Sequence, residues 1–135
     1  MGKNRAGAQF AGFGRSALKT LTMPSGNKGD NLSAIDLGRN YAYIVVKCLD
    51  VTGIAATTAL SAQVAYDDDD ALCTLYEKDN PSLAWSITPL PTTSGSFAFL
   101  LLHAFGAQRI KLLLSKNTTA AVTFQIYGLA ESVQG

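Results

Sequence analysis

The stretch that decides the fold is AQRIKLLLSKNTTAAVTFQIYG, residues 107–128. It contains two segments of alternating apolar and polar side chains around a Lys-Asn-Thr-Thr sequence that favours a turn. In the second segment, 121–128, Val122, Phe124 and Ile126 share one face, and more polar residues occupy the other. A period of two is typical of strands that bury one face. The stretch therefore predicts an antiparallel hairpin.

The same alternation recurs along the chain from residue 17, and groups of Pro, Gly, Asn, Asp and Ser separate the segments. Nine ranges are candidate strands: 17–23, 33–37, 41–49, 59–66, 71–77, 83–88, 97–103, 108–115 and 121–128. The second has the weakest pattern, so we expect about eight strands. No segment beyond residue 17 has helical periodicity. Short strands separated by frequent turns predict an all-β fold, an antiparallel β-sandwich or jelly roll.

Charge divides the chain into two parts. The first 29 residues carry five cations and no carboxylate, whereas residues 30–135 carry six cations and ten carboxylates. Residues 1–16 are glycine-rich and aperiodic, so we expect an extended basic arm there and a single β-sandwich domain over residues 17–135. Parts of opposite charge attract, so the arm either ties neighbouring copies together or folds over its own acidic body.

Several residues are candidates for contacts with other proteins. In the arm, Phe10 and Phe13 are candidate apolar anchors, and Arg5, Arg15 and Lys19 are candidate charge contacts.

Residues 97–102 are apolar on both faces of the expected strand, which favours either a central, doubly covered strand or a subunit interface with Phe97 and Phe99 as contacts. The four carboxylates Asp67, Asp68, Asp69 and Asp70 lie between two expected strands. They form a solvated loop, a weak calcium site or a landing site for a basic arm.

No set of residues predicts catalysis, a metal or a cofactor. His103 is the only histidine, and no nucleophile motif accompanies it. Cys48 and Cys73 lie in apolar strand-like runs, so we expect buried free thiols, with a disulfide as the alternative. Gly12 to Ala17 matches a dinucleotide-binding pattern by letter, but it lacks the preceding strand and the following helix.

The composition also limits the partners. Charged residues make up 16% of the chain, against about 25% in typical domains, which suggests that partners cover part of the surface. Five cations in 29 residues are sparse for a nucleic-acid-binding arm, so nucleic acid is not an expected partner. The sequence lacks a secretory signal pattern, and its longest apolar run is too short to span a bilayer, so no membrane association is expected.

The closing strand–turn–strand, with its Asn/Thr turn and its Tyr127-Gly128 ending, resembles that of small β-sandwich virion proteins of tailed bacteriophages. The group includes capsid decoration (cement) proteins and neck or tail components. The resemblance implies self-assembly, often as trimers, on a larger shell, and it transfers no functional residue. We therefore expect a non-enzymatic capsid decoration subunit that binds itself and a major capsid or other virion protein. It would assemble in the host cytoplasm and reside in the virion.

Two other interpretations remain open. The chain could be a neck, tail or main capsid subunit of the same kind of particle. It could instead be a carbohydrate-binding β-sandwich that stacks Trp85 and exposed tyrosines on sugars. The alternation of residues 83–88 places Leu83, Trp85 and Ile87 on one face, toward the core, which disfavours that interpretation.

Overall fold

The computed structural model describes residues 17–66, 71–77, 80–92, 95–101 and 107–129. Within these ranges the chain is all-β and every strand pair is antiparallel, which confirms the prediction of an all-β fold with antiparallel strands. The described strands are β1 (Lys19–Met23), β2 (Ile35–Tyr41), β3 (Tyr43–Cys48), β4 (Leu60–Ala65), β5 (Cys73–Thr74), β6 (Tyr76–Glu77), β7 (Asn80–Ala84), β8 (Ser86–Ile87), β9 (Phe97–Leu101), β10 (Ala107–Leu114) and β11 (Val122–Leu129).

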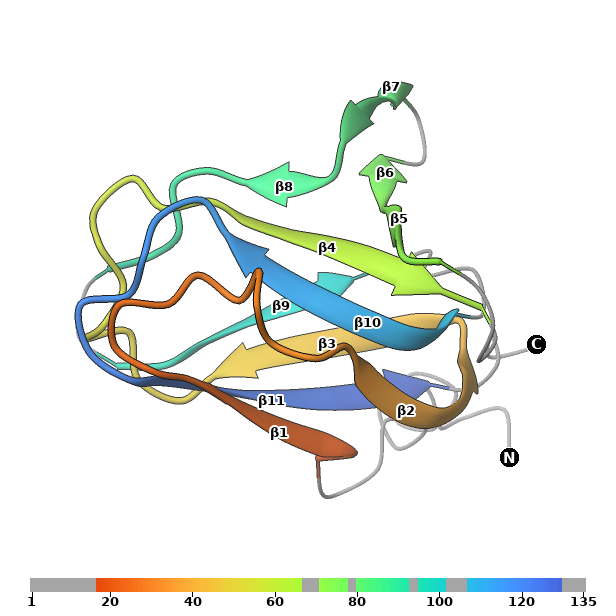
Figure 1. Ribbon diagram of the computed structural model, residues 1–135, viewed down its shortest axis with the longest axis horizontal. Helices are drawn as coiled ribbons and strands as arrows, with labels where there is room; N and C mark the ends of the chain where they lie inside the picture. The colour runs from red at the N-terminus through yellow and green to blue at the C-terminus, as the bar shows by residue number, and fades with distance from the viewer. Residues whose placement is uncertain (1–16, 67–70, 78–79, 93–94, 102–106, 130–135) are drawn as a thin grey trace, which may run out of the picture.

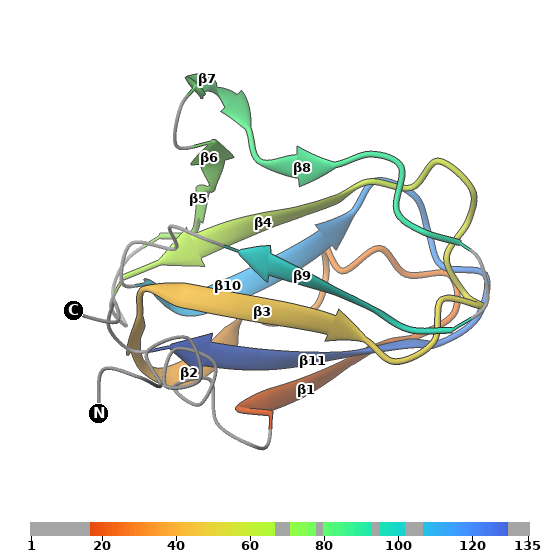
Figure 2. The ribbon, with the colours of Figure 1, turned by 180° about the vertical axis from the view of Figure 1, so that it is seen from behind.

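The long strands form two sheets. The first has the order β1-β11-β3-β9, and the second has the order β2-β10-β4-β5, with β8 also paired to β4. Figures 1 and 2 show the sheets face to face, with β10 in front of β11 and β3 in one view and behind them in the other. This arrangement is consistent with a β-sandwich.

The strand pairs are nested in the sequence, as in one long folded hairpin. Each pair of strands forms one rung of this hairpin. Three ladders pair Lys19 with Ile126, Ile35 with Ile110, and Ile44 with Leu101. From each of these pairs to the next, the first partner advances along the chain by as many residues as the second goes back. The first and third rungs lie in the first sheet and the second rung lies in the second sheet, so successive rungs alternate between the sheets.

The core fills the space between the sheets. Its largest fully buried side chains are Phe124, Met23, Ile44, Leu60, Leu90, Ile110, Leu112, Ile126, Val46, Val51 and Val122. Residues of β3, β4, β10 and β11 alternate between this core and the outside, as the sequence predicts. Because a fully buried aliphatic or aromatic side chain contributes about 1.5–3 kcal/mol, these four strands supply much of the driving force for folding.

The second strand differs from its prediction. It starts two residues later than expected and continues to Tyr41, which was expected to begin the following strand. Asp36 pairs with Arg109 and Tyr41 pairs with Ala107, so β2 advances five positions while β10 moves two. Three extra residues of β2, within 37–40, therefore form a bulge. Gly38 adopts a φ of 85° in this bulge, and its N–H donates to the Asp36 carboxylate at 2.8 Å.

The fourth strand of the second sheet is interrupted. Gln63 pairs with Thr74, whereas Ser61, two residues earlier, pairs with Ser86, twelve residues after Thr74. Ten extra residues therefore leave the ladder between β5 and β8, and they contain the β6–β7 hairpin. The predicted continuous strands over 71–77 and 83–88 are thus wrong. Figure 1 shows the hairpin projecting from one edge of the sandwich.

Candidate assembly interface

The predicted contact residues that the structure describes lie at two opposite edges of the first sheet. Arg5, Phe10, Phe13, Arg15 and Asp67 to Asp70 lie outside the described residues. Lys19 is exposed at the first residue of β1, and Phe97 and Phe99 lie on β9. Because β1 and β9 occupy opposite edges of the first sheet, Lys19 does not share a contact surface with the phenylalanines.

Among the described strands, β9 lies at an edge of the first sheet, which argues against the alternative of a central strand. Phe97 and Phe99 pair with the buried residues Cys48 and Val46, so both rings lie on the core side of the sheet. They are nevertheless only half-buried, because no further strand of the described chain lies beside them. Their ring centroids are 4.7 Å apart. Ala98, between them, is exposed.

The outer face of the first sheet carries little charge. Among the outward positions of β1, β11 and β3, Lys47 is the one charged residue; the others are Thr20, Thr22, Thr123, Gln125, Tyr127, Tyr43 and Val45. The hydroxyls of Thr22 and Thr123 are hydrogen-bonded at 3.0 Å, and Tyr127 donates to Gln125 at 3.3 Å. Removing water from such a low-charge face costs little free energy, which suits contact with another protein.

The projecting hairpin exposes two large apolar side chains, one of which the sequence predicts in the core. Leu83, predicted to face the core, is 50% exposed, and Tyr76, on the neighbouring strand, is 48% exposed. Trp85 and Ile87 are half-buried and pack against the core, as expected. The sequence carries one signal for the hairpin, because Lys78 to Pro81 is a turn sequence between the two apolar runs.

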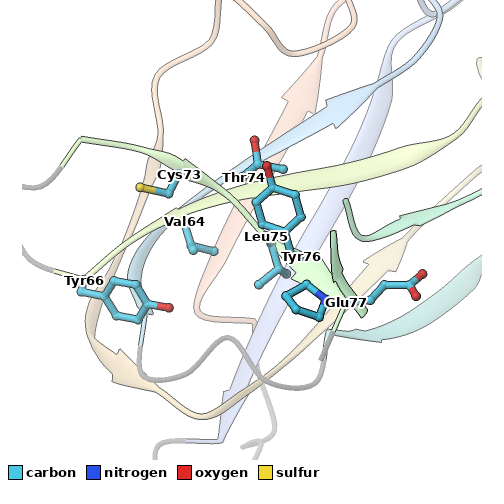
Figure 3. Close-up of a pocket in the computed structure, with 8 residues that line it drawn as sticks. Val64, Tyr66, Cys73, Thr74, Leu75, Tyr76 and Glu77 are labelled. Atoms are coloured by element: carbon cyan, nitrogen blue, oxygen red, sulfur yellow. The ribbon is translucent and has the colours of Figure 1, made fainter. Parts of the chain in front are cut away.

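A pocket of about 300 Å³ lies between the hairpin and β4. It is lined by Val64, Tyr66, Cys73, Thr74, Leu75, Tyr76, Glu77 and Pro81. Figure 3 shows Cys73 and Tyr66 on one side of this pocket and Glu77 on the other. Partial burial of the Tyr66 ring, and then the nearby Cys73, raise the pKa of the Tyr66 phenol, which favours its neutral form.

A second hollow, of about 490 Å³, lies on the outer face of the second sheet. Its polar groups come from Lys28, Asp30, Ser61, Ser86 and Ser115. Lys111, on the same face, is already engaged, because its ammonium donates to the carbonyl oxygen of Asp30 at 2.6 Å.

The two cysteines differ in exposure, and both are free thiols. Cys48 is fully buried on β3, and burial raises the pKa of its thiol. Its Sγ donates to the carbonyl oxygen of Asp50 at 3.4 Å. Cys73 is exposed at the start of β5, which corrects the prediction that both thiols are buried. The reason is that β5 lies at the interrupted edge of the second sheet.

Within the described part of the chain, no three His, Cys, Asp or Glu residues are grouped closely enough to hold a metal ion. No helix in those same ranges is long and apolar enough to cross a membrane. A comparison of the sequence with protein-family models and with curated proteins finds no match to either.

Proposed function

We propose that the two sheets form a jelly roll of eight strands. In this assignment β5 and β8 are two halves of one strand, and the β6–β7 hairpin is an insertion between them. The proposal rests on the nested pairing of β1 with β11, β2 with β10, β3 with β9, and β4 with β5 and β8. A long hairpin whose successive rungs alternate between two facing sheets has the connectivity of a jelly roll.

From this fold we infer a structural role in a virus particle, that of a non-enzymatic capsid decoration or cement subunit. Jelly rolls are frequent in viral capsid proteins and in lectins, and a fold by itself leaves the function open. Two features favour a particle subunit: the low charge on the outer face of the first sheet, and an N-terminal segment of opposite charge to the rest of the chain. A neck, tail or main capsid subunit would use the same features.

In this role the sandwich supplies a rigid body and the N-terminal segment supplies a tether. Arg5, Arg15 and Lys19 would contact acidic surfaces of the shell or of neighbouring copies, with Asp67 to Asp70 as one such surface. Phe10 and Phe13 would fill apolar pockets, and Phe97 and Phe99 would line a second contact. The free energy gained from these contacts must exceed the entropic cost of ordering the tether.

Reattachment to the source particle tests this role. Particles are purified and searched for the chain by mass spectrometry, then stripped and incubated with recombinant protein, either complete or lacking residues 2–16. We expect the chain in the particles and reattachment of the complete protein alone. A chain absent from particles would refute the role, and reattachment of the truncated protein would refute the tether.

A carbohydrate-binding role is the second candidate, and the tyrosines beside the 300 Å³ pocket favour it. Tyr66 is 41% exposed and lies with Tyr76 at the rim of this pocket, where Glu77 and Thr74 offer hydrogen bonds. Exposed aromatic rings next to polar groups suit the faces and hydroxyls of sugars. In a glycan screen, binding that is lost in Tyr76→Ala but kept in Leu83→Ala, on the same hairpin, would support this role.

A further inference from the structure

The four edges of the two sheets are not equally protected against pairing with another strand. Strand β1 carries Lys19 and is followed by Pro24, and β2 carries the bulge that contains Arg39. The edge formed by β5 and β8 is interrupted by the hairpin and followed by Pro89. Charges, prolines, bulges and interruptions are the devices that keep edge strands from pairing. Strand β9, with the sequence FAFLL and an unbroken register, has none of them.

The direction of the backbone groups of β9 follows from one hydrogen bond. The N–H of Leu49 donates to the carbonyl oxygen of Thr123 at 3.0 Å, so Leu49 directs its backbone groups toward β11. Because this direction alternates along a strand, Cys48, Val46 and Ile44 direct theirs toward β9.

Their partners on β9 are Phe97, Phe99 and Leu101, whose backbone groups therefore point back to β3. The N–H and C=O groups of Ala98 and Leu100 consequently point away from the sheet. In the described part of the chain, β3 is the one strand that pairs with β9. This edge thus offers two residues whose outward donors and acceptors pair with no described strand.

We infer that β9 pairs with the β9 strand of a second copy, antiparallel and about a two-fold axis. This deepens the proposed structural role, on which it rests, by naming the partner of the Phe97 and Phe99 contact. When Ala98 lies opposite Leu100 of the other copy, the two residues exchange two hydrogen bonds, and the symmetric pair exchanges two more. The two four-stranded sheets then become one sheet of eight strands.

The features of the β9 edge favour a second copy of the chain as its binding partner. The strand has no charge, so two copies do not repel each other there. Two-fold pairing places the two Phe99 residues opposite each other on the core side, where the rings are half-buried in a single copy. Self-pairing of one edge closes after two copies, so trimers would need another contact.

Oligomeric mass tests the inference with recombinant full-length protein. Sedimentation equilibrium should give twice the monomer mass of 14.2 kDa. Ala98→Pro removes one outward N–H and no bond to β3, so this variant should be a folded monomer. Ala98→Thr, the matched control, keeps the N–H and should remain a dimer. A monomeric wild-type protein, or a dimeric Ala98→Pro variant with wild-type circular dichroism, would overturn the inference.

Amide hydrogen exchange keeps the test decisive if Ala98→Pro fails to fold. In the wild-type protein the amides of Ala98 and Leu100 should become protected as the concentration rises, while those of Phe97 and Phe99 stay protected throughout. Protection of Ala98 that does not change with concentration would contradict the inference.

Two further outcomes separate this inference from its alternatives. Loss of the dimer on deletion of residues 2–16 would mean that the N-terminal segment joins the copies, and it would overturn the inference. A dimer formed by a chain that is absent from virus particles would retain the inference and refute the proposed role.

Discussion

The hydroxyl of Thr118 donates a 2.5 Å hydrogen bond to the carbonyl oxygen of Pro24, 94 positions earlier in the chain. The same hydroxyl accepts a bond of 3.3 Å from the N–H of Asn27. Two backbone bonds, from Gly26 to Thr118 and from Thr118 to Asn27, join the same segments. The turn between β10 and β11 and the segment after β1 therefore form one unit at an end of the sandwich.

Thr118→Val should destabilise the protein by about 1 kcal/mol, because it keeps the shape of the buried side chain and removes its two part-buried hydrogen bonds, to the Pro24 carbonyl and from the Asn27 N–H. Urea unfolding measures the change. Thr119→Val, at the exposed neighbouring position, is the matched control and should change stability by less than about 0.5 kcal/mol. Equal losses in the two variants would contradict this account.

Gly29→Ala should be more destabilising than Gly26→Ala. Both glycines have positive φ, of 92° and 77°, so both substitutions carry backbone strain of about 1–2 kcal/mol. A Cβ at Gly29 would also lie 2.4 Å from the carbonyl oxygen of Leu112, whereas a Cβ at Gly26 meets nothing within 4 Å. Thermal unfolding of the two variants separates the steric cost from the strain. Equal melting temperatures would show that β10 moves aside freely.

The alternation of side chains was enough to predict most of the core, and it fails where the chain leaves the regular ladder. Phe124 and Ile126 are buried as predicted, because β11 lies within a sheet that has one face on the core. Leu83 is exposed because β7 belongs to the projecting hairpin. Tyr41 ends β2 because of a bulge with three extra residues, and periodicity does not reveal a bulge.

The candidate interface was less predictable than the core. The apolar pattern singled out Phe97 and Phe99, but whether their strand is central or at an edge depends on pairing with residues about fifty positions away. Long-range order of this kind does not follow from local sequence. The predicted contacts of Phe10 and Phe13 stay predictions, because both lie outside the described residues.

Excision of residues 76–85 should leave a folded protein. Removal of these ten residues places Ser86 directly after Leu75, which donates its N–H to the carbonyl oxygen of Ala62. Ser86 and Ile87 keep their partners Ser61 and Leu60, so the shortened edge strand continues in one register. Circular dichroism and thermal unfolding would check this. An unfolded variant would show that the hairpin is part of the fold rather than an insertion.

The excised protein should nevertheless lose about 1–2 kcal/mol, because half-buried Trp85 packs against the core. Trp85→Ala in the full chain is the control for this term and should show a similar loss. A much larger loss on excision than in Trp85→Ala would mean that the hairpin stabilises the sandwich through other contacts.

The two cysteines should react with thiol reagents at very different rates. Cys73 is exposed, whereas Cys48 is fully buried in the core, and burial raises the pKa of the Cys48 thiol. Because the thiolate is the reactive form, the native protein should release one equivalent of chromophore with Ellman's reagent at pH 8, and a second only after denaturation. Cys73→Ser should remove the fast phase and leave Cys48 protected until unfolding. A rapid reaction of the Cys73→Ser variant under native conditions would show that β3 opens readily, and it would place the first sheet among the weakly protected parts of the molecule.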